Sequence, residues 1–454
     1  MPLPVPERKA LLLKLRNPER VTQVLTRHQI VDQEQGLVAV PHKTEAMLVL
    51  KNLGIHIGND MAPINFLYQH PKLRGLFGPM PHQAVSAAFC SLHPKCYVLN
   101  EQRTGKTASV LWASDFLRQE KTIRGATLIV STMSTMRRVW RDEIFSLFPA
   151  RTVGVLHGSR ATRLKLLATD FDYLIVNHDG IKTIGTPLVD AVLSGRIGHV
   201  IVDEGGDFSD HTTEKYKTLK AICDPCQWVW WLTATPVSKG PDKAWAQAQI
   251  VNPRTVADTY GEWRAQVLFQ VSKYKWVPRA EATDRVHEAL QPAIRFFKRD
   301  VLKDLPPLTH QQLDTELTKE QDRAIKDLRN QGAALIDGAV VEAVNAAVLV
   351  GKVLQVCAGV VKDAEGNPVV LDCAPRLEVL RELIEGTNQK VLVFASHRAV
   401  IDRLLKEIGQ YAKVVWVDGR VTGRARDTAI RMFQEDAETK VFLAHPKTVS
   451  HGLE

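Results

Sequence analysis

The chain has 454 residues, of which 45% are hydrophobic and 24% charged, a composition that is typical of folded domains and excludes a disordered chain. Its formal charge of +9 favours an acidic polymer as partner. No run of 18 apolar residues predicts a membrane span, no signal peptide is evident, and six cysteines are too few for a disulfide scaffold, so we expect a protein of the reducing cytoplasm.

Residues 1–75 predict an accessory segment, because no clear sheet pattern runs through them. One stretch inside it is more regular: residues 38–55 read VAVPHKTEAMLVLKNLGI. This stretch predicts a short strand followed by a helix that ends at Gly54.

Residues 76–250 alternate short apolar strands with helical stretches. The strands read YVLN, ATLIVST, DYLIVNHD, HVIVDE and WVWWLTAT. They are rich in Val, Ile and Leu and mostly do not alternate with polar residues, as in a parallel sheet that is covered on both faces. We therefore predict an α/β doubly wound domain.

The remaining chain predicts a connector with helices over residues 251–310 and a second α/β domain over residues 311–454. The strands of this second domain read KVLVFAS, AKVVWVDG and KVFLAHP. Residues 340–361 predict an amphipathic helix packed on a core, because Glu342, Asn345 and Lys352 fall on one helical face.

Residues 100–107 read NEQRTGKT and resemble a phosphate-binding loop in which Asn100 replaces the usual first glycine. A strand precedes the loop and a helix follows it, so that backbone N–H groups and the helix N-terminus can receive phosphates. Lys106 can reach the terminal phosphates, and the Thr107 hydroxyl can ligate Mg²⁺. Asn is the least costly replacement for glycine, because its short side chain tolerates left-handed backbone. The predicted ATP site comprises Asn100, Arg103, Thr104, Gly105, Lys106 and Thr107.

Two carboxylates follow another strand about a hundred residues later, in the stretch HVIVDEGG, residues 199–206. Asp203 can hold Mg²⁺ through water, and Glu204 can orient and deprotonate the attacking water. An acidic pair alone is equally typical of a helix cap or a turn, but its order after the phosphate loop favours catalysis. Thr233 and Thr235, in WLTATP, can bond toward the nucleotide site and the second domain.

Much of the positive charge lies just after the phosphate loop. Between Arg118 and Lys165 there are ten Lys/Arg against three Asp/Glu, which leaves a net charge of +7. This clustering favours contacts with a phosphate backbone, and a solvated surface is the alternative. The CDPC stretch at 223–226 has no second cysteine pair at zinc-knuckle spacing, so we interpret it as structural.

Taken in order, MPHQ, GKT, STMSTMRRVWRDE, IVNHD, VDEGG and LTATP resemble the motifs of superfamily 2 helicases, in the form of SNF2-type DNA-dependent ATPases and similar to the short versions carried by bacteriophages. In the second domain, KVLVFASHR resembles motif IV, DGRVTGRARDTAIRMFQ the segment after it, and LAHPKTVSHGLE the opening of motif V. The resemblance spans roughly residues 76–454. It implies two RecA-like doubly wound parallel-sheet domains, the second incomplete, with ATP and Mg²⁺ as cofactors and DNA as partner.

The resemblance also implies roles for single residues. Gln83 would read the adenine edge. Trp140 and Glu143 match the family's Trp-x-x-Glu and would be structural. The segments that touch the nucleic-acid backbone in the family match Ser134, Arg137, Arg138, Asn177 and His178, and a solvated or capping role is the alternative for each.

Two positions depart from the family pattern. Arg103 stands where many relatives have glycine, and it either stays exposed or leans on a phosphate. Gly206 stands where the family usually has His or Asp, a side chain that couples the ATP state to the second domain. Asp207 is one residue late to replace it, so the departure bears on the efficiency of coupling rather than on the fold.

The predicted function is that of an ATP-dependent DNA helicase or translocase whose two domains close on ATP, in the cytoplasm of a bacterial or phage-infected cell. One alternative, a nucleic-acid-binding scaffold with a weak or dead ATPase site, is favoured by Asn100 and Gly206. The intact catalytic and metal-binding side chains argue against it. A second alternative is an RNA helicase.

The last residue, Glu454, lies within the motif V segment, ahead of the arginine-bearing motif VI of the family. We expect from this a truncated product or a partial reading of a longer gene, which binds ATP but hydrolyses it poorly and leaves an open edge and an uncovered apolar face on the second sheet. The alternative is a complete short protein whose arginine finger comes from Arg424, Arg426 or a partner chain.

Overall fold

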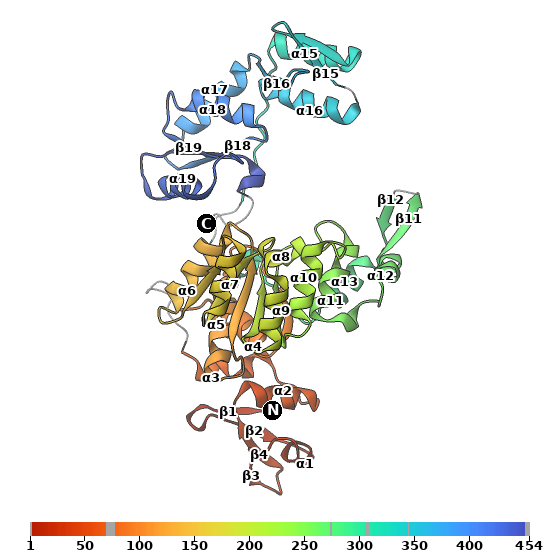
Figure 1. Ribbon diagram of the computed structural model, residues 1–454, viewed down its shortest axis with the longest axis vertical. Helices are drawn as coiled ribbons and strands as arrows, with labels where there is room; N and C mark the ends of the chain where they lie inside the picture. Colours follow the sequence, from red (N-terminus) through yellow and green to blue (C-terminus); the bar gives the residue numbers. More distant parts are fainter. Residues whose placement is uncertain (1, 70–77, 273–274, 305–307, 344, 450–454) are drawn as a thin grey trace. The chain divides into compact units, whose positions relative to one another are not determined.

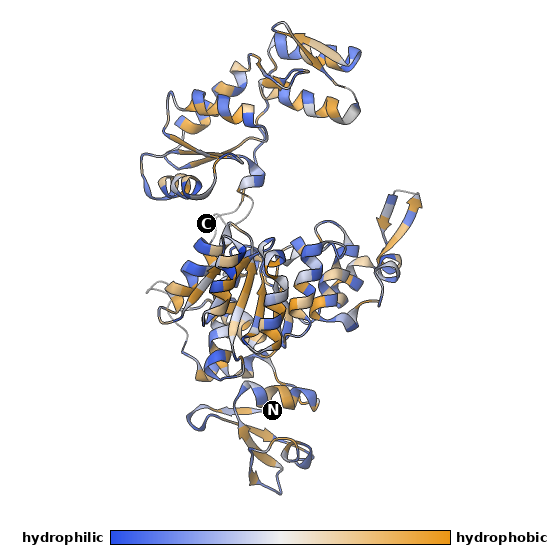
Figure 2. Ribbon diagram, in the orientation of Figure 1, coloured by the Kyte–Doolittle hydropathy of each residue, from blue (hydrophilic) through white to orange (hydrophobic). Residues whose placement is uncertain are grey.

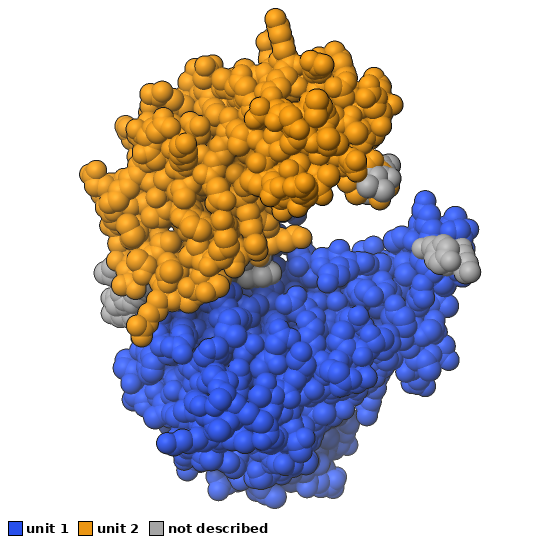
Figure 3. Space-filling model, turned by 45° about the horizontal axis from the view of Figure 1, so that its top comes forward, with its two compact units in different colours: residues 1–306 blue, residues 307–454 orange. Residues whose placement is uncertain are grey.

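The computed structural model describes residues 2–69, 78–272, 275–304, 308–343 and 345–449. The chain divides into two compact units, Met1–Pro306 and Pro307–Glu454, which are coloured separately in Figure 3. Part of the predicted motif V segment, residues 450–454, lies outside the described residues, as do residues 1 and 70–75 of the predicted accessory segment.

The first unit begins with a small antiparallel sheet (Figure 1). Its strands β1 (Leu3–Val5), β2 (Ala10–Lys14), β3 (Gln29–Asp32) and β4 (Leu37–Pro41) pair in the order β1-β2-β4-β3. The predicted strand and helix are confirmed as β4 and α2 (Thr44–Asn52), with Gly54 beyond the helix at a φ of +79°. The strands β1, β2 and β3 were not predicted, because they are short and lie among charged residues that obscure a strand pattern.

A seven-stranded parallel sheet forms the centre of the first unit, in the order β13-β5-β10-β9-β6-β8-β7. The five predicted strands are confirmed as β5 (Lys95–Val98), β6 (Ala126–Ser131), β8 (Tyr173–Asn177), β9 (Ile197–Val202) and β10 (Trp228–Leu232). Two further strands, β7 (Val153–Leu156) and β13 (Ala293–Ile294), were not predicted, since β13 has only two residues and a glycine interrupts the apolar run of β7.

Helices cover both faces of this sheet, which is why its strands are apolar throughout (Figure 2). Trp230 packs into the core beneath α4 (Pro81–Ser91) and α5 (Lys106–Gln119), whereas its neighbour Trp231 packs into the core on the opposite face. Helices on the two faces also include α6 (Asp142–Leu147), α7 (Arg160–Ala168), α9 (Gly185–Leu193), α10 (Glu214–Cys223) and α11 (Ala244–Val251). The predicted doubly wound domain is confirmed.

The segment predicted as a helical connector extends the first unit instead. It contains α12 (Tyr260–Val267), a hairpin of β11 (Leu268–Ser272) and β12 (Lys275–Pro278), α13 (Ala282–Ala289) and α14 (Lys298–Val301). Between α13 and α14, β13 joins the edge of the parallel sheet beside β5. A two-residue strand has no sequence signature, so only its pairing with β5 reveals it.

The second unit contains a three-stranded parallel sheet in the order β18-β20-β19. The predicted strands are confirmed as β18 (Val391–Phe394), β19 (Val414–Val417) and β20 (Val441–Ala444), with α17 (Ala374–Glu385), α18 (Arg398–Ile408) and α19 (Gly423–Glu435) around them. On β18, Leu392 and Phe394 are 56% and 55% exposed.

The single helix predicted over residues 340–361 is wrong. The segment forms the end of β15 (Ala339–Glu342), then α16 (Ala346–Cys357), then β16 (Val360–Lys362). Asn345 separates the strand from the helix. Its side chain accepts a hydrogen bond from Val348 N at 3.0 Å and so caps the N-terminus of α16. Two hairpins, β15 with β14 (Ala333–Ile336) and β16 with β17 (Pro368–Val370), flank the helix, which follows α15 (Lys319–Gln331).

Among the residues that the structure describes, every helix is too short or too polar to cross a membrane.

Candidate active site

The carboxyl ends of β5, β6, β8, β9 and β10 lie at one edge of the parallel sheet, because parallel strands all point the same way. Each predicted motif of the first domain follows one of these strands, apart from the residues of α4. The fold therefore gathers the predicted site residues from stretches of chain that are far apart in sequence.

The phosphate loop leads from β5 into α5, whose first residue is Lys106. Gly105 has a φ of +76°, and a Cβ there would lie 1.9 Å from Gln83 Nε2. The backbone conformation favours glycine at this position, and a side chain there would displace the Gln83 amide. The next two residues, Lys106 and Thr107, stand in the first turn of α5, where backbone N–H groups have no partner inside the helix.

The Lys106 ammonium lies inside the loop, where it donates to Asn100 O at 2.8 Å and to Glu101 O at 3.2 Å. Burial lowers the pKa of Lys106, and the negative charges of Glu204 and Asp203 oppose this effect. The ammonium thus lies within electrostatic reach of both predicted catalytic carboxylates.

Asn100 is buried and does not have the left-handed backbone that the sequence argument assumed for it. Its side chain instead donates to Ser86 Oγ at 2.9 Å and accepts from Phe296 N at 2.9 Å. It therefore joins the end of β5 to α4 and to the segment after β13. The reason given for tolerating Asn at this position is wrong, and the side chain has a structural role of its own.

Arg103 is exposed and has a φ of +65°. Glycine adopts this left-handed conformation without strain, whereas other residues pay roughly 1–2 kcal/mol. The backbone therefore keeps the conformation of a glycine loop although the residue is arginine. Thr104, next in the loop, is buried, and its hydroxyl donates to Glu101 O at 2.8 Å.

Asp203 is partly buried directly after β9, and donors hold both its carboxylate oxygens. Trp140 Nε1 donates to Oδ2 at 2.9 Å, and Glu204 N donates to Oδ1 at 3.1 Å. Burial raises the pKa of Asp203, and the Trp140 hydrogen bond is the largest effect that opposes it. A carboxylate has about four lone-pair directions, so two remain for a metal-bound water.

The contact between Trp140 and Asp203 was not predicted, since Trp140 was interpreted only as structural. The indole is fully buried and belongs to a π-helical turn, Met136–Arg141. Such turns are rare and frequent at functional sites. No periodicity in the sequence indicates one, but the Trp-x-x-Glu spacing could have directed attention to it.

Glu204 has a φ of +49°, a conformation that is uncommon for any residue with a long side chain. Backbone outliers of this kind concentrate at functional sites. This conformation turns the chain immediately after Asp203, ahead of the short helix η4 (Gly205–Phe208).

Asn177 and His178, predicted as DNA contacts, are both buried at the end of β8. Asn177 Oδ1 accepts from Arg163 Nη1 at 3.4 Å. His178 Nε2 lies 2.9 Å from Asp203 O and donates to it, because a carbonyl only accepts, while Nδ1 lies 3.3 Å from Asp207. These contacts link the β8 end to the acidic motif, and the predicted contact with DNA stays a prediction.

Gly205 and Gly206 follow the carboxylates and differ in how much room they have. A Cβ at position 205 would lie 2.2 Å from the Trp231 ring, so only glycine fits. A Cβ at position 206 would lie 3.4 Å from Thr235 O and 3.5 Å from Thr233 Oγ1, at ordinary contact distance. A side chain at position 206 would thus face the two predicted coupling threonines.

Gln83 lies in the first turn of α4, beside the phosphate loop. Its Oε1 accepts from Met80 N at 2.9 Å, and Nε2 lies 3.5 Å from Thr104 O. The neighbouring His82 Nε2 also contacts Thr104 O, at 2.8 Å. The glutamine is therefore engaged with its own helix end and the loop, and its predicted contact with adenine stays a prediction.

Three arginines of the basic stretch predicted as a DNA footprint are used inside the protein, whereas five of its ten basic residues are exposed. Arg118 pairs with Asp172 at 3.8 Å, Arg151 pairs with Asp115 at 2.7 Å, and Arg163 donates to Leu156 O at 2.7 Å. Of the predicted contacts after β6, Arg137 is exposed, Arg138 is partly buried, and Ser134 Oγ lies 3.0 Å from Thr132 Oγ1.

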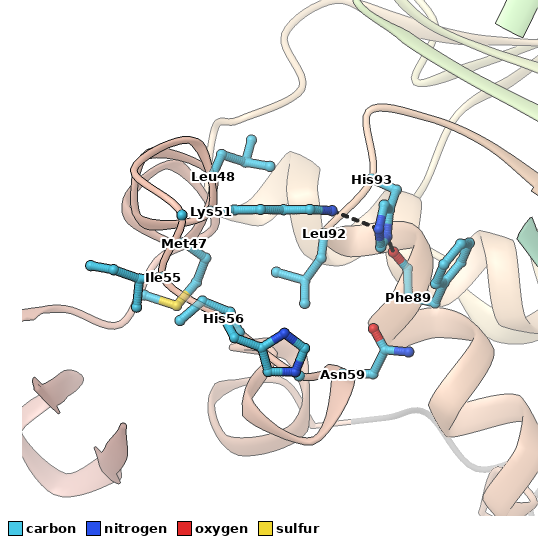
Figure 4. A pocket seen from close by; sticks show the side chains of 12 residues that line it. Met47, Leu48, Lys51, Ile55, His56, Asn59, Phe89, Leu92 and His93 are labelled. Atoms are coloured by element: carbon cyan, nitrogen blue, oxygen red, sulfur yellow. Dashed lines mark hydrogen bonds between the residues drawn. The ribbon is translucent and has the colours of Figure 1, made fainter. Parts of the chain in front are cut away.

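A pocket of about 470 Å³ lies elsewhere in the first unit, between α2 and the end of α4 (Figure 4). Burial lowers the pKa of His93 to about 4. The neutral ring accepts from Lys51 Nζ at 2.7 Å and donates to Phe89 O at 2.8 Å. None of the predicted site residues lines this pocket, and its main polar groups are paired with one another.

The CDPC stretch behaves as buried structure. Burial raises the pKa of Cys223 and raises that of Cys226 to about 11, and Cys226 Sγ donates to Trp228 O at 3.2 Å. Within the described ranges, no group of three or more His, Cys, Asp or Glu side chains is arranged to hold a metal ion.

Comparisons with known proteins were made for both sequence and structure. A family model for the SNF2-related domain matches residues 85–356. The DNA annealing helicase and endonuclease ZRANB3 of Mus musculus is 23% identical over 387 residues, which cover 79% of this chain and 33% of that protein. The ISWI chromatin-remodeling complex ATPase CHR17 of Arabidopsis thaliana is 23% identical over 377 residues, covering 78% of this chain and 34% of the relative. The chain thus spans about a third of the length of these relatives.

A solved structure, the Sulfolobus solfataricus SWI2/SNF2 ATPase core in complex with dsDNA, superposes with a TM-score of 0.44 at 17% identity. The alignment covers 83% of this chain and 80% of that chain.

Proposed function

Because the chain belongs to the SNF2-related domain family, we propose that it is an ATP- and Mg²⁺-dependent motor that acts on DNA as a helicase or translocase. One observation carries the proposal: a lysine at the start of α5 lies within electrostatic reach of Asp203 and Glu204, at the carboxyl edge of a doubly wound sheet. The proposal includes a cytoplasmic location in a bacterial or phage-infected cell, in keeping with six free thiols.

The residues present fit a nucleotide and its metal. The first turn of α5 and the loop N–H groups would receive the phosphates, and the Lys106 ammonium would exchange its loop carbonyls for phosphate oxygens. The Thr107 hydroxyl and Asp203 would hold Mg²⁺, which when bound neutralises charge on the phosphates. Glu204 would orient the attacking water and take its proton.

DNA is the proposed partner because relatives of this chain are named for acting on DNA or chromatin and because the chain is basic overall. Contacts to the backbone at Ser134, Arg137, Arg138, Asn177 and His178 are part of the proposal, of which exposed Arg137 is the best placed. Thr233 and Thr235 would transmit the nucleotide state to the second domain. Position 206 faces both threonines but is a glycine, so it adds no side chain to this coupling.

The test is ATP turnover of the full chain with and without DNA, in wild type and two variants. Lys106→Ala should lower turnover by about 10²–10³-fold, because the lost ammonium stabilises charge on the transferred phosphoryl group. Glu204→Gln should keep ATP binding and lose turnover. Lys217→Ala serves as control, since Lys217 is exposed on α10 and pairs with Glu214.

Each other outcome selects a different function. Hydrolysis by Lys106→Ala at the wild-type rate would contradict the ATP site. DNA binding by the wild type without measurable ATP turnover would identify a nucleic-acid-binding scaffold. Stronger stimulation by RNA than by DNA would identify an RNA helicase.

A further inference from the structure

The hairpin of β11 and β12 projects from the first unit beside α12 (Figure 1). Its two strands pair only with each other among the described residues. An isolated two-stranded ribbon is marginally stable in water, so contacts at its base must hold it in place.

The base of the hairpin is firmly held on one face. Gln270 lies opposite Trp276, and the Arg264 guanidinium stacks on the Trp276 ring, 3.7 Å from its centroid. At the end of β12, Arg279 Nε donates to Ala265 O at 2.9 Å and to Leu268 O at 3.2 Å. Trp276 also packs against the core of the first unit. These contacts give the hairpin a defined direction.

The other face of the ribbon is apolar and exposed. Phe269 lies opposite Val277 on this face, and the Phe269 ring is 44% exposed. Val271, at the irregularity between Gln270 and Ser272, is 55% exposed. Figure 2 shows β11 mostly in the hydrophobic colour. Neighbouring exposed apolar side chains of this kind are typical of an interaction site, whereas a single exposed apolar residue is not.

The chain around this ring is basic in sequence. Between Glu262 and Glu281 the sequence holds four cations and no acidic residue. One of them, Lys275, is exposed on β12 opposite Ser272. An exposed aromatic face in a basic stretch of chain matches single-stranded nucleic acid, whose bases stack on rings while its phosphates meet cations.

We propose that the β11–β12 hairpin binds single-stranded nucleic acid, with a base stacked on Phe269 and the adjoining phosphate near Lys275. The inference rests on the proposed function, because it specifies that the DNA motor contacts a single strand as well as duplex. A duplex has no unstacked base to offer, so the hairpin distinguishes a fork or a single strand from a blunt duplex.

The experiment measures the affinity of the full chain, without nucleotide, for a single strand, a forked duplex and a blunt duplex of the same length. Phe269→Ala should weaken binding of the single strand and the fork about five- to tenfold and change blunt-duplex binding less than about twofold. Phe269→Tyr keeps a stacking ring and should restore wild-type affinity. Lys275→Gln should reduce the salt dependence of single-strand binding by roughly one unit in slope. Leu193→Ala is the matched control, because Leu193 is an exposed apolar side chain on α9.

Equal single-strand and fork affinity for wild type and Phe269→Ala would overturn the proposal and leave the apolar face to a protein partner. Equal weakening on all three DNAs would overturn it too, because stacking cannot act on a blunt duplex. Because binding is measured without ATP, the result does not depend on whether the chain hydrolyses ATP. The hairpin proposal and the proposed motor function can therefore fail separately.

Discussion

Trp140 connects the hydrophobic core of the first unit to the predicted metal ligand Asp203. Its indole N–H donates a hydrogen bond to the Asp203 carboxylate at 2.9 Å. Trp140→Phe keeps an aromatic ring in the core and removes this donor. Burial already raises the pKa of Asp203, and loss of the hydrogen bond raises it further. Asp203 must be ionised to hold Mg²⁺, so we expect the acid limb of turnover to move to higher pH, with the Mg²⁺ requirement raised about tenfold.

The control for this prediction is Trp228→Phe, another buried tryptophan whose indole N–H has no partner within the described part of the chain. It should change stability without moving the pH profile. Identical pH profiles and Mg²⁺ requirements for wild type and Trp140→Phe would show that the indole only fills space.

The two neighbouring glycines after Glu204 allow a matched comparison. Gly205→Ala places a methyl group 2.2 Å from the Trp231 ring and should destabilise the first unit by about 1–3 kcal/mol. Gly206→Ala meets atoms only at ordinary contact distance and should change stability by less than about 0.5 kcal/mol. Thermal unfolding followed by tryptophan fluorescence suits this test, because only Trp416 of the nine tryptophans lies in the second unit. Similar melting temperatures for both variants would contradict the steric argument.

At the scale of elements, Asn100 joins three of them: β5, α4 and the segment after β13. Asn100→Gly restores the usual phosphate-loop residue, yet it should destabilise the first unit by about 1–3 kcal/mol, because Phe296 N and Ser86 lose a buried partner. The same fluorescence melt measures the effect. A variant at least as stable as wild type would show that these hydrogen bonds contribute nothing. Asn100→Asp is a useful companion, since it keeps the acceptor for Phe296 N and loses the donor to Ser86.

At the scale of the whole molecule, the net charge of +9 predicts DNA binding that weakens steeply as salt rises. Three arginines of the basic stretch are engaged inside the protein, so we expect the exposed cations to make the contacts with DNA phosphates. Arg137→Ala should lower the slope of log affinity against log salt by roughly one unit. Arg141→Ala, from the same turn, should leave the slope unchanged, since Arg141 already pairs with Asp142 at 2.7 Å. Equal slopes for Arg137→Ala and wild type would place the DNA backbone elsewhere.

The apolar runs predicted most strands and the residue order predicted the phosphate loop, because such signals lie within a few consecutive residues. The strand β13 and most of the N-terminal sheet were not predicted, since these strands are short and defined by their pairing partners. The role of Asn100 was wrong for a similar reason, because its partner Phe296 lies 196 residues away. The error over residues 340–361 was local, at the Asn345 cap of α16.

The sequence by itself determined the α/β class and the order in which motifs follow the parallel strands. It also placed Lys106, Thr107, Asp203 and Glu204 after the ends of strands. These follow from local hydrophobic patterns and from the chemistry of each residue type. Only the tertiary structure decided which donors hold Asp203, which arginines remain exposed, and which face of the β11–β12 hairpin is open. Such properties depend on hydrogen bonds and burial between distant segments, as with Trp140 and Asp203, 63 residues apart, and no local pattern encodes them.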